Sequence, residues 1–322
     1  MTGLENGWGL QVVLWFQAWR VPLMEAFAQV FNVLGSEEFY IVFIPFVYWC
    51  IDVLMGRRML IALMISVWSN SAFKTVWNRP RPYQVSTQVH NIIVEPSSGI
   101  PSGHVQNSTV MVSTLADSIK RGWFTGLMVI YILLMAISRM VAGVHFPQDV
   151  IAGAVIGLLI FAAYLWLERP VSTWLARQSL ALQIGFVIAA ALVMGLLHPL
   201  AIRNFDPNAL KNLMTVFGVV VGGGIGFVLE ERTVRFSAAG LATQRGLRLV
   251  VGIVIAMALR YGLQAAFAPL GVEPLFRFIR YSIIGFWMAY GAPWVFIRFN
   301  LAGHRDVPST PIVEAGATAA SK

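Results

Sequence analysis

The chain has 322 residues, of which 57% are hydrophobic and only 12% are charged, and its mean hydropathy is +0.71. Soluble domains carry about 25% charged residues, so this composition excludes an ordinary soluble domain and indicates an integral membrane protein made of helices. The net charge of +8 would favour nucleic-acid binding in a soluble protein. Here the basic residues lie in short loops beside apolar runs, and we expect no nucleic-acid partner.

The N-terminal region is apolar but interrupted by polar and charged residues. Residues 10–34 contain Arg20 and Glu25, and charges are costly inside a membrane. Residues 1–38 are therefore interpreted as an amphipathic helix that lies in the membrane interface, with a tenth membrane span as the alternative. The segment lacks a basic region at its start, and no cleaved signal peptide is expected.

Apolar runs of nearly membrane-spanning length follow one another along the rest of the chain. They predict an all-α, polytopic bundle of about nine spans. The predicted spans are residues 39–55, 58–77, 103–119, 123–141, 149–167, 180–198, 212–229, 248–267 and 281–297. Cys50, the only cysteine, lies in the first span, which excludes an internal disulfide and a cysteine-based metal site. The Gly222–Gly226 run predicts close helix packing, and Glu230 and Glu231 are expected in a solvated loop.

Lysine and arginine are distributed unevenly between the two sets of loops. Every loop of one set carries basic residues, so this set is expected in the cytoplasm together with the C-terminus. The N-terminus then faces outward, and the compact loops favour a bacterial inner membrane with its outer side in the periplasm. Residues 306–322 are small and polar, and a disordered cytoplasmic tail is predicted there.

Three short motifs lie at span ends on this outer side. They are KTVWNRPRP from Lys74 to Pro82, PSGH from Pro101 to His104, and SRMVAGVHFPQD from Ser138 to Asp149. Together they supply Lys74, Arg81 and Arg139 as cations, two imidazoles and one carboxylate at one membrane surface. This combination predicts a site that holds a phosphate group and attacks it there.

Phosphoryl transfer depends mainly on positioning the phosphate and stabilising its charge. Arg81 and Arg139 offer planar forks that bind phosphate oxygens in pairs, and Lys74 adds a point charge. Ser102 and Gly103 start a predicted helix, where backbone N–H groups form an anion site. These five residues are the predicted phosphate ligands.

The two histidines can divide the remaining work. His145 and Asp149 are four residues apart, so on a helix they would share a face and the carboxylate would orient the imidazole. His145 is therefore the predicted nucleophile and His104 the predicted general acid. Pro147 lies between His145 and Asp149, and a turn is the alternative to a helix there.

The spacings Lys-x6-Arg-Pro, Pro-Ser-Gly-His and Ser-Arg-x5-His-x3-Asp resemble the three signature motifs of the type 2 phosphatidate phosphatase superfamily. This group includes lipid phosphate phosphatases, polyprenyl pyrophosphate phosphatases, sphingosine phosphate phosphatases, glucose-6-phosphatase and the vanadium haloperoxidases. The resemblance covers about residues 35–168. It implies a helical core, hydrolysis without a metal or other cofactor, and a phosphohistidine intermediate. The roles it implies for the motif residues agree with those above, and Ser138 is assigned no chemical step.

The resemblance divides the chain into an expected catalytic core at 39–168 and a four-span extension at 169–305. The expected substrates are membrane lipids, namely lipid phosphates or polyprenyl pyrophosphates, because their head groups already lie at the depth of the motifs. A glucose-6-phosphatase-like sugar-phosphate phosphatase and a lipid phosphotransferase are the alternatives. A transporter or flippase is less favoured, because the ionisable residues cluster at one face rather than at the midplane.

Several further polar residues are left without a catalytic assignment. His90 and Glu95 lie in the outer loop 83–100, which is expected to cap the site. Arg260 lies inside the eighth predicted span, where pairing with Glu273, contact with a head group or snorkelling to the outer face are all open.

Overall fold

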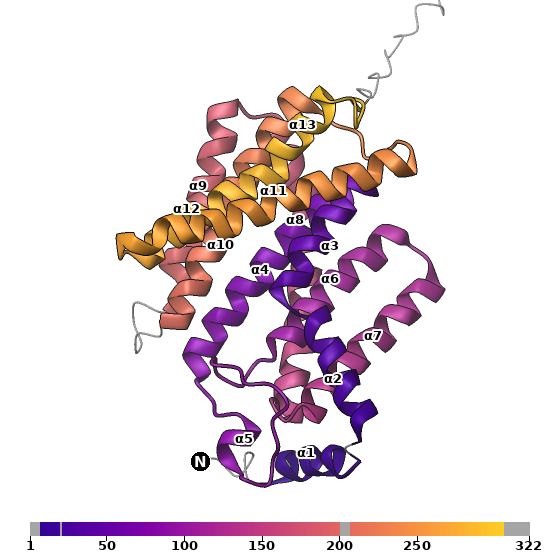
Figure 1. Cartoon of the computed structure of the whole chain (residues 1–322), viewed down its shortest axis with the longest axis vertical. Coiled ribbons are helices and arrows are strands. Elements are labelled where there is room, and N and C mark those ends of the chain that lie inside the picture. Colours follow the sequence, from indigo (N-terminus) through magenta and orange to yellow (C-terminus); the bar gives the residue numbers. More distant parts are fainter. Residues whose placement is uncertain (1–6, 20, 200–206, 306–322) are drawn as a thin grey trace, which may run out of the picture.

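The computed structural model describes residues 7–19, 21–199 and 207–305, and these ranges are all-α, which confirms the predicted fold class (Figure 1). Within them, extended backbone pairs only in one isolated bridge between Phe236 and His304. The α-helices are α1 (Trp8–Ala18), α2 (Pro22–Leu34), α3 (Glu37–Cys50), α4 (Val53–Trp77), α5 (Pro82–Val85), α6 (Gly103–Ile119), α7 (Gly122–Val141), α8 (Pro147–Ala176), α9 (Leu180–Leu197), α10 (Pro207–Leu229), α11 (Ala242–Phe267), α12 (Glu273–Phe286) and α13 (Ala292–Arg298). Two π-helical turns, η2 (Glu230–Val234) and η4 (Trp287–Gly291), and one 3-10 turn, η3 (Ala268–Leu270), complete them.

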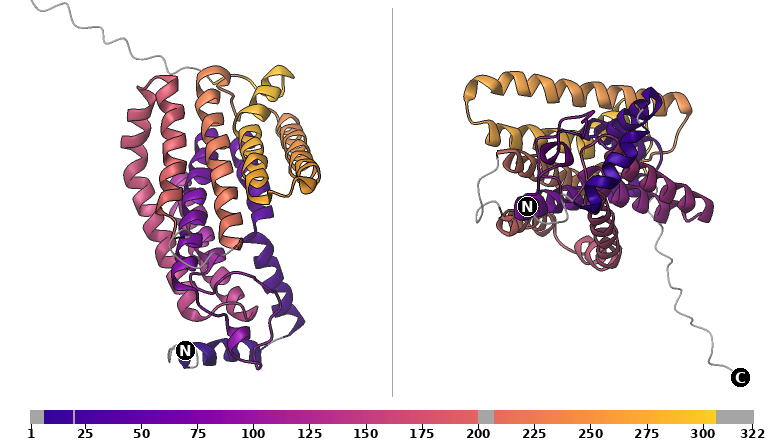
Figure 2. Two further views of the ribbon diagram at one scale, coloured as in Figure 1. Left: turned by 90° about the vertical axis from the view of Figure 1, so that its left-hand side faces the viewer. Right: turned by 90° about the horizontal axis from the view of Figure 1, so that it is seen from below.

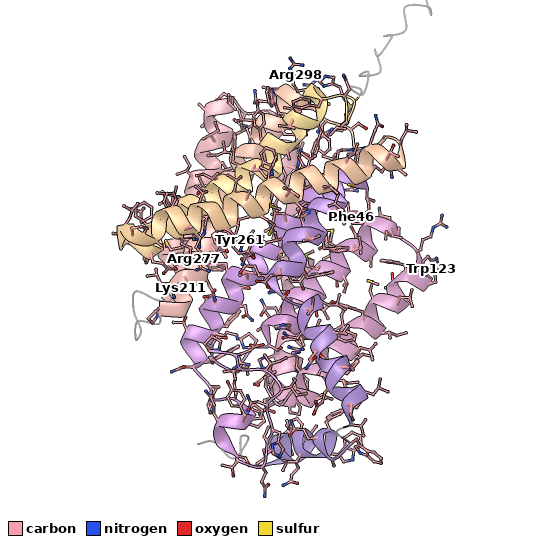
Figure 3. All side chains as sticks on the ribbon, in the orientation of Figure 1. Phe46, Trp123, Lys211, Tyr261, Arg277 and Arg298 are labelled. Atoms are coloured by element: carbon pink, nitrogen blue, oxygen red, sulfur yellow. The ribbon has the colours of Figure 1, made fainter. Side chains whose placement is uncertain are left out.

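Six helices of the described ranges are long and apolar enough to cross a membrane. They are α4, α7, α8, α9, α10 and α11, and the bent pair α2–α3 raises the count to seven if it forms one span. Helices cover the nine predicted spans, although 39–55 crosses the break between α3 and α4. Residues 39–55, 103–119 and 281–297 do not meet this test singly, so the count of nine stays a prediction. Apolar side chains cover the outside of the bundle, as lipid-facing helices require: Trp123 and Tyr261, both labelled in Figure 3, are 68% and 59% exposed.

The N-terminal region forms two helices rather than the single predicted one. Pro22 occupies the first turn of α2, where its missing N–H costs nothing, and α1 ends at Ala18 before it. A second break follows at Gly35, and α3 starts behind Ser36, whose side chain accepts a hydrogen bond from Phe39 N at 3.2 Å. The two helices α2 and α3 meet at 56°. An interfacial position for this region stays a prediction.

Helix ends carry the first motif to one end of the bundle. Asp52 caps α4 by accepting a hydrogen bond from Met55 N at 2.6 Å, and Asn78 ends the helix with a left-handed φ of 38°. Lys74 therefore lies in the last turn of α4 and Arg81 just before α5. Figures 1 and 2 show α5 and α1 together at the end of the molecule opposite α13.

Within the extension, two helices pack against each other at very short distance. A Cβ at Gly222 would overlap with the backbone of Ser282, and one at Gly285 would lie 2.9 Å from Gly223 N. The backbones of α10 and α12 therefore touch, which confirms the packing predicted for the glycine run.

An ionic cluster joins core and extension at the end of the molecule remote from the motifs. Arg57 on α4 bonds Glu230 at 2.9 Å and Glu231 at 3.0 Å, and Arg305 bonds both carboxylates at 3.1 Å. Glu230 is completely buried. The expectation of a solvated loop at Glu230 is therefore wrong, because its charge is neutralised by two arginines that lie far away in sequence.

Candidate active site

The third motif forms a short turn between α7 and α8. Arg139 lies in the last turn of α7, and α8 starts at Pro147 behind Phe146. Asp149 is the third residue of α8, and its Oδ2 accepts a hydrogen bond from Phe146 N at 2.9 Å. His145 therefore precedes the helix, and the turn alternative holds: the helix cap, not a shared helical face, brings His145 and Asp149 together.

His145 is completely buried and has a different partner at each ring nitrogen. Its Nδ1 lies 3.4 Å from Asp149 Oδ2, and its Nε2 lies 3.3 Å from Arg81 Nη1. These partners assign the proton to Nδ1 and the lone pair to Nε2. Burial, together with the charges of Arg81 and neighbouring cations, lowers the pKa of His145 well below its ordinary value. A neutral imidazole with Nε2 unprotonated is the form a nucleophile requires.

Arg81 is also completely buried and connects several parts of the site. Its Nε donates to Ser97 O at 2.7 Å, and its Nη1 donates to Val144 O at 3.0 Å. Its Nη2 donates to Glu95 Oε2 at 2.9 Å. Its Nη2 also donates to Ser98 O at 3.2 Å, so each of the three guanidinium nitrogens bonds a backbone carbonyl, while Nη1 and Nη2 in addition face His145 and Glu95.

Arg139 is held by the N-terminal helix α2. Its Nη1 donates to Asn32 Oδ1 at 3.0 Å, and its Nη2 donates to Ala28 O at 3.1 Å. The hydroxyl of Ser138 accepts a third hydrogen bond, from Arg139 Nε at 3.2 Å. The serine of the third motif thus orients the arginine beside it.

His104 stands at the start of α6 and also contacts α2. Its Nε2 lies 3.3 Å from Asn32 O, and its Nδ1 lies 3.6 Å from Glu95 Oε1. A carbonyl can only accept, so Nε2 carries a proton and Nδ1 is the nitrogen that can gain or release one. A Cβ at Gly35 would overlap with the His104 ring. The break between α2 and α3 therefore leaves just enough room for this imidazole.

The PSGH turn differs in one respect from the expected anion site. Ser102 N donates to Asp149 O at 2.9 Å, so this amide is already occupied by the third motif. The Ser102 hydroxyl is buried, and among the described residues it has no hydrogen-bond partner. Gly103 allows α6 to approach Asn70, whose Oδ1 would lie 3.1 Å from a Cβ there. The hydroxyl of Ser102 and the amide of Gly103 remain as donors.

Glu95 lies where the cations converge. Its Oε2 binds Arg81, and its Oε1 lies 4.0 Å from Arg139 Nη1 as well as beside His104. Burial raises the pKa of Glu95, but the charges of His104, Arg81, Lys74 and Arg139 outweigh it and lower that pKa to about 2. The carboxylate is therefore ionised and is the anion that this cluster holds.

Lys74 joins the cluster through Ser97. Its Nζ donates to Ser97 Oγ at 2.9 Å, and Arg81 Nη2 donates to the same oxygen at 3.2 Å. All eight predicted site residues therefore lie in one connected arrangement.

Three residues that the motifs do not include belong to this arrangement, namely Asn32, Glu95 and Ser97. Glu95 is an isolated acidic residue in the loop 83–100. The sequence shows that this loop carries a carboxylate, but it does not show that the carboxylate lies among the cations. Asn32 lies in an apolar helix far from the motifs in sequence, and only the tertiary fold brings it to Arg139 and His104.

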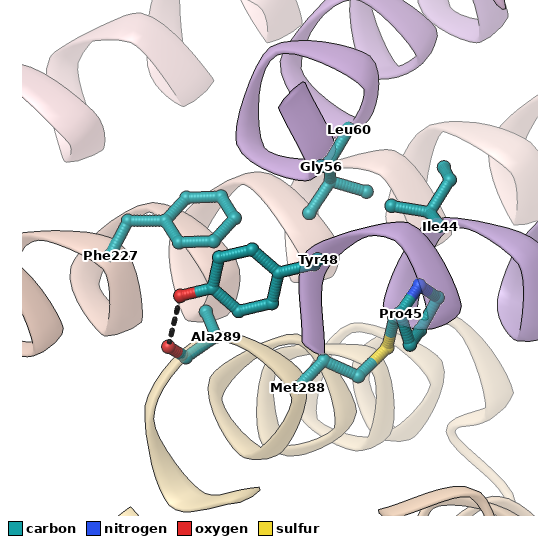
Figure 4. Close-up of a pocket in the computed structure, with 8 residues that line it drawn as sticks. All are labelled: Ile44, Pro45, Tyr48, Gly56, Leu60, Phe227, Met288 and Ala289. Atoms are coloured by element: carbon teal, nitrogen blue, oxygen red, sulfur yellow. Dashed lines mark hydrogen bonds between the residues drawn. The ribbon is translucent and has the colours of Figure 1, made fainter. Parts of the chain in front are cut away.

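An apolar pocket in the bundle lies apart from this site. It is lined by Ile44, Pro45, Tyr48, Gly56, Leu60, Phe227, Met288 and Ala289, and Tyr48 OH donates to Ala289 O at 3.1 Å across it (Figure 4). None of its residues is ionisable at neutral pH, so it offers no chemistry for phosphate. In the described part of the chain, no three His, Cys, Asp or Glu side chains are arranged to hold a metal ion.

Comparison with protein families assigns both halves of the chain. Residues 56–171 match the profile of the PAP2 superfamily, and residues 214–304 match that of the PAP2 superfamily phosphatase transmembrane extension. The first range contains all three motifs. The second contains α12, α13 and most of α10, together with α11.

Several characterised proteins are similar to this chain. Sphingosine-1-phosphate phosphatase 2 of Homo sapiens is 34% identical over 206 residues, which are 62% of this chain and 50% of that protein. Sphingosine-1-phosphate phosphatase 1 of Rattus norvegicus is 23% identical over 306 residues, 82% of this chain and 69% of that protein. Undecaprenyl-diphosphatase of Sulfolobus acidocaldarius is 32% identical over 105 residues, 32% of this chain and 50% of that protein. The chain thus spans about half the length of the human relative that it matches.

Proposed function

The chain belongs to the PAP2 superfamily, and from this premise we propose that it is a membrane-embedded phosphatase that hydrolyses lipid phosphates through a phosphohistidine intermediate. One observation carries the proposal. The neutral His145 presents Nε2 beside the Arg81 guanidinium, and the same guanidinium binds an anionic oxygen at 2.9 Å. The proposed nucleophile therefore lies next to the guanidinium that binds an anionic oxygen. A phosphate held by Arg81 would lie close to His145 Nε2, as attack on phosphorus requires.

The first half-reaction transfers the phosphoryl group to the enzyme. His145 Nε2 attacks phosphorus and forms an N–P bond, while the P–O bond to the lipid alcohol breaks. His104 donates its Nδ1 proton to the departing oxygen. Arg81, Arg139 and Lys74 stabilise the charge on the non-bridging oxygens. Asp149 stabilises the positive charge that develops on His145.

The second half-reaction returns the enzyme to its starting state. His104, now neutral, takes a proton from a water molecule as that water attacks phosphorus. The N–P bond breaks, inorganic phosphate leaves, and His145 regains its lone pair. This sequence consumes one water molecule for each phosphate released and needs no further reactant. The eight site residues keep the roles predicted for them, with the Ser102 hydroxyl in place of its amide as a phosphate ligand.

A phosphorylated long-chain base is the proposed substrate. The relatives named for sphingosine 1-phosphate match large parts of this chain, 62% of it for the human protein and 82% for the rat protein. A polyprenyl diphosphate is the second candidate, because the archaeal undecaprenyl-diphosphatase matches the chain at 32% identity. We place the site on the outer side of the membrane, in agreement with the distribution of basic loops.

The test is phosphate release by the full chain purified in detergent. Sphingosine 1-phosphate, phosphatidate, undecaprenyl diphosphate and glucose 6-phosphate are compared, each with a chelator present. We expect chelator-resistant release from sphingosine 1-phosphate and its loss in His145→Ala. The matched control is His90→Ala, which removes a histidine from the outer loop without touching the cations. Release from glucose 6-phosphate alone, or release that survives in His145→Ala, would contradict the proposal.

A further inference from the structure

Glu95 imitates a bound phosphate in its choice of partners. Its two carboxylate oxygens divide between Arg81 on one side and the pair Arg139 and His104 on the other. These are three of the groups that the proposed reaction assigns to the phosphate and its leaving oxygen. A carboxylate and a phosphate dianion cannot share these cations, because like charges at such distances repel strongly in a buried site.

The fit of the carboxylate is incomplete. Oε2 is well bound, but Oε1 is buried, and no donor of the described residues reaches it within hydrogen-bond distance. His104 Nδ1 at 3.6 Å and Arg139 Nη1 at 4.0 Å are its nearest charged neighbours. A buried acceptor without a donor is unfavourable. A phosphate, with three terminal oxygens and a larger radius, would satisfy donors that the planar carboxylate leaves unused, among them the Ser102 hydroxyl.

The loop around Glu95 is fixed at both ends but not in its middle. At one end, Gln17 donates to His90 O at 2.7 Å, and Ile92 N donates to Ala142 O at 3.1 Å. At the other end, Gly99 N donates to Arg79 O at 2.8 Å. Between them, Lys74 and Arg81 hold Ser97, and Tyr83 OH donates to Glu95 O at 3.0 Å. Ile93 packs against the buried cluster that contains Val141, and its carbonyl accepts from Asn91 Nδ2 at 3.3 Å. Val94 beside Glu95 is 74% exposed, so the segment has room to move outward.

We propose that the Glu95 carboxylate occupies the phosphate position of the resting enzyme and that a phosphate group binds by displacing it together with residues 93–97. The inference rests on the proposed function, since it uses the same cations as phosphate ligands. Phosphate competes for Arg81 and Lys74, which are also the groups that hold the segment. Binding of phosphate and release of the segment are therefore one event. Glu95 lowers the affinity of the site for every phosphate, including the product.

The test uses inorganic phosphate as the probe and the full chain in detergent. Isothermal titration should show phosphate binding about tenfold more tightly to Glu95→Gln and to Glu95→Ala than to the original protein. The matched control is Glu38→Gln, which removes a carboxylate that is 66% exposed and pairs with Arg260. That control should leave the affinity unchanged. Equal or weaker phosphate binding in both Glu95 variants would overturn the inference.

A second measurement separates displacement from simple charge repulsion. Amide hydrogen exchange in residues 93–97 of the original protein should become faster when phosphate is bound, because the segment has left the cations. Unchanged or slower exchange there would mean that phosphate and Glu95 coexist, and would overturn the inference. Lipid hydrolysis is measured on the same preparations. If the lipids are hydrolysed but the Glu95 variants bind phosphate no more tightly, only the displacement is rejected. If the Glu95 variants bind phosphate more tightly but no lipid is hydrolysed, only the proposed function is rejected.

Discussion

Asn32 Oδ1 accepts a hydrogen bond from Arg139 Nη1 at 3.0 Å, and through this bond the N-terminal helix α2 becomes part of the proposed active site. The backbone carbonyl of the same asparagine lies 3.3 Å from His104 Nε2. One residue outside the motifs therefore orients both a proposed phosphate ligand and the proposed general acid. Removal of the N-terminal region would disturb two motifs at once.

Asp149→Asn should separate the chemical role of Asp149 from its structural one. The asparagine carbonyl can still accept the bond from Phe146 N, so the start of α8 is retained. The charge that orients His145 and stabilises its positive form is lost. We expect lipid phosphatase activity to fall by about 10²- to 10⁴-fold, with the thermal midpoint nearly unchanged. A fall in stability without a comparable fall in activity would contradict the proposed role.

Gly35→Ala should damage the site by steric overlap alone. The backbone of Gly35, at φ −101° and ψ 3°, suits alanine, but the added methyl group would overlap with the His104 ring. Displacement of His104, the proposed general acid, by about 1 Å can cost about 10²-fold in rate. Gly126→Ala is the control, because nothing lies within 4 Å of a Cβ there. Initial rates of the two variants are compared, and equal rates would show that His104 tolerates the shift.

Arg139→Lys tests the need for a planar fork. A lysine cannot bond Asn32 Oδ1 and Ala28 O while still facing Glu95. We expect a loss of about 10²-fold in kcat/KM, since the positive charge remains but its position does not. Arg79→Lys changes a cation within the first motif that is not one of the predicted ligands, and this variant should retain most of the activity. An equal kcat/KM in the two variants would contradict the assignment of Arg139 as a phosphate ligand.

The buried His145 should make stability depend on pH. Its pKa is lowered in the folded protein, so the unfolded chain takes up a proton near the ordinary value of 6.5 while the folded one does not. The unfolded state then binds more protons, and the free energy of unfolding decreases as the pH falls below 6.5, by up to about 1.4 kcal/mol per pH unit. Thermal midpoints between pH 8 and pH 5 check this. His145→Asn should flatten the dependence, and an unchanged slope would show that other groups cause it.

The motifs were predictable from sequence because their chemistry is local: cations, imidazoles and a carboxylate at fixed spacings beside apolar runs. The helical class followed from the length of those runs. The position of Glu95 was not predictable, because a loop acid among the cations depends on how the chain folds back from α5 to α6. The break at Pro22 and the pairing of Arg260 with Glu38 rather than Glu273 likewise depend on contacts between distant helices. For the same reason the amide of Ser102 was expected to be free, although Asp149 O accepts from it.

The ionic cluster of Arg57, Glu230, Glu231 and Arg305 bears on how the two halves of the chain can be combined. The first half supplies one cation, Arg57, and the second half supplies both carboxylates and Arg305. A fragment that ends after α8 would leave Arg57 without the anions that neutralise it, and a fragment that starts after α8 would leave the buried Glu230 without Arg57. Catalytic domain and extension are thus not interchangeable modules. A chimera that joins one half of this chain to the other half of a relative would need matching charges at Arg57 and at the two carboxylates.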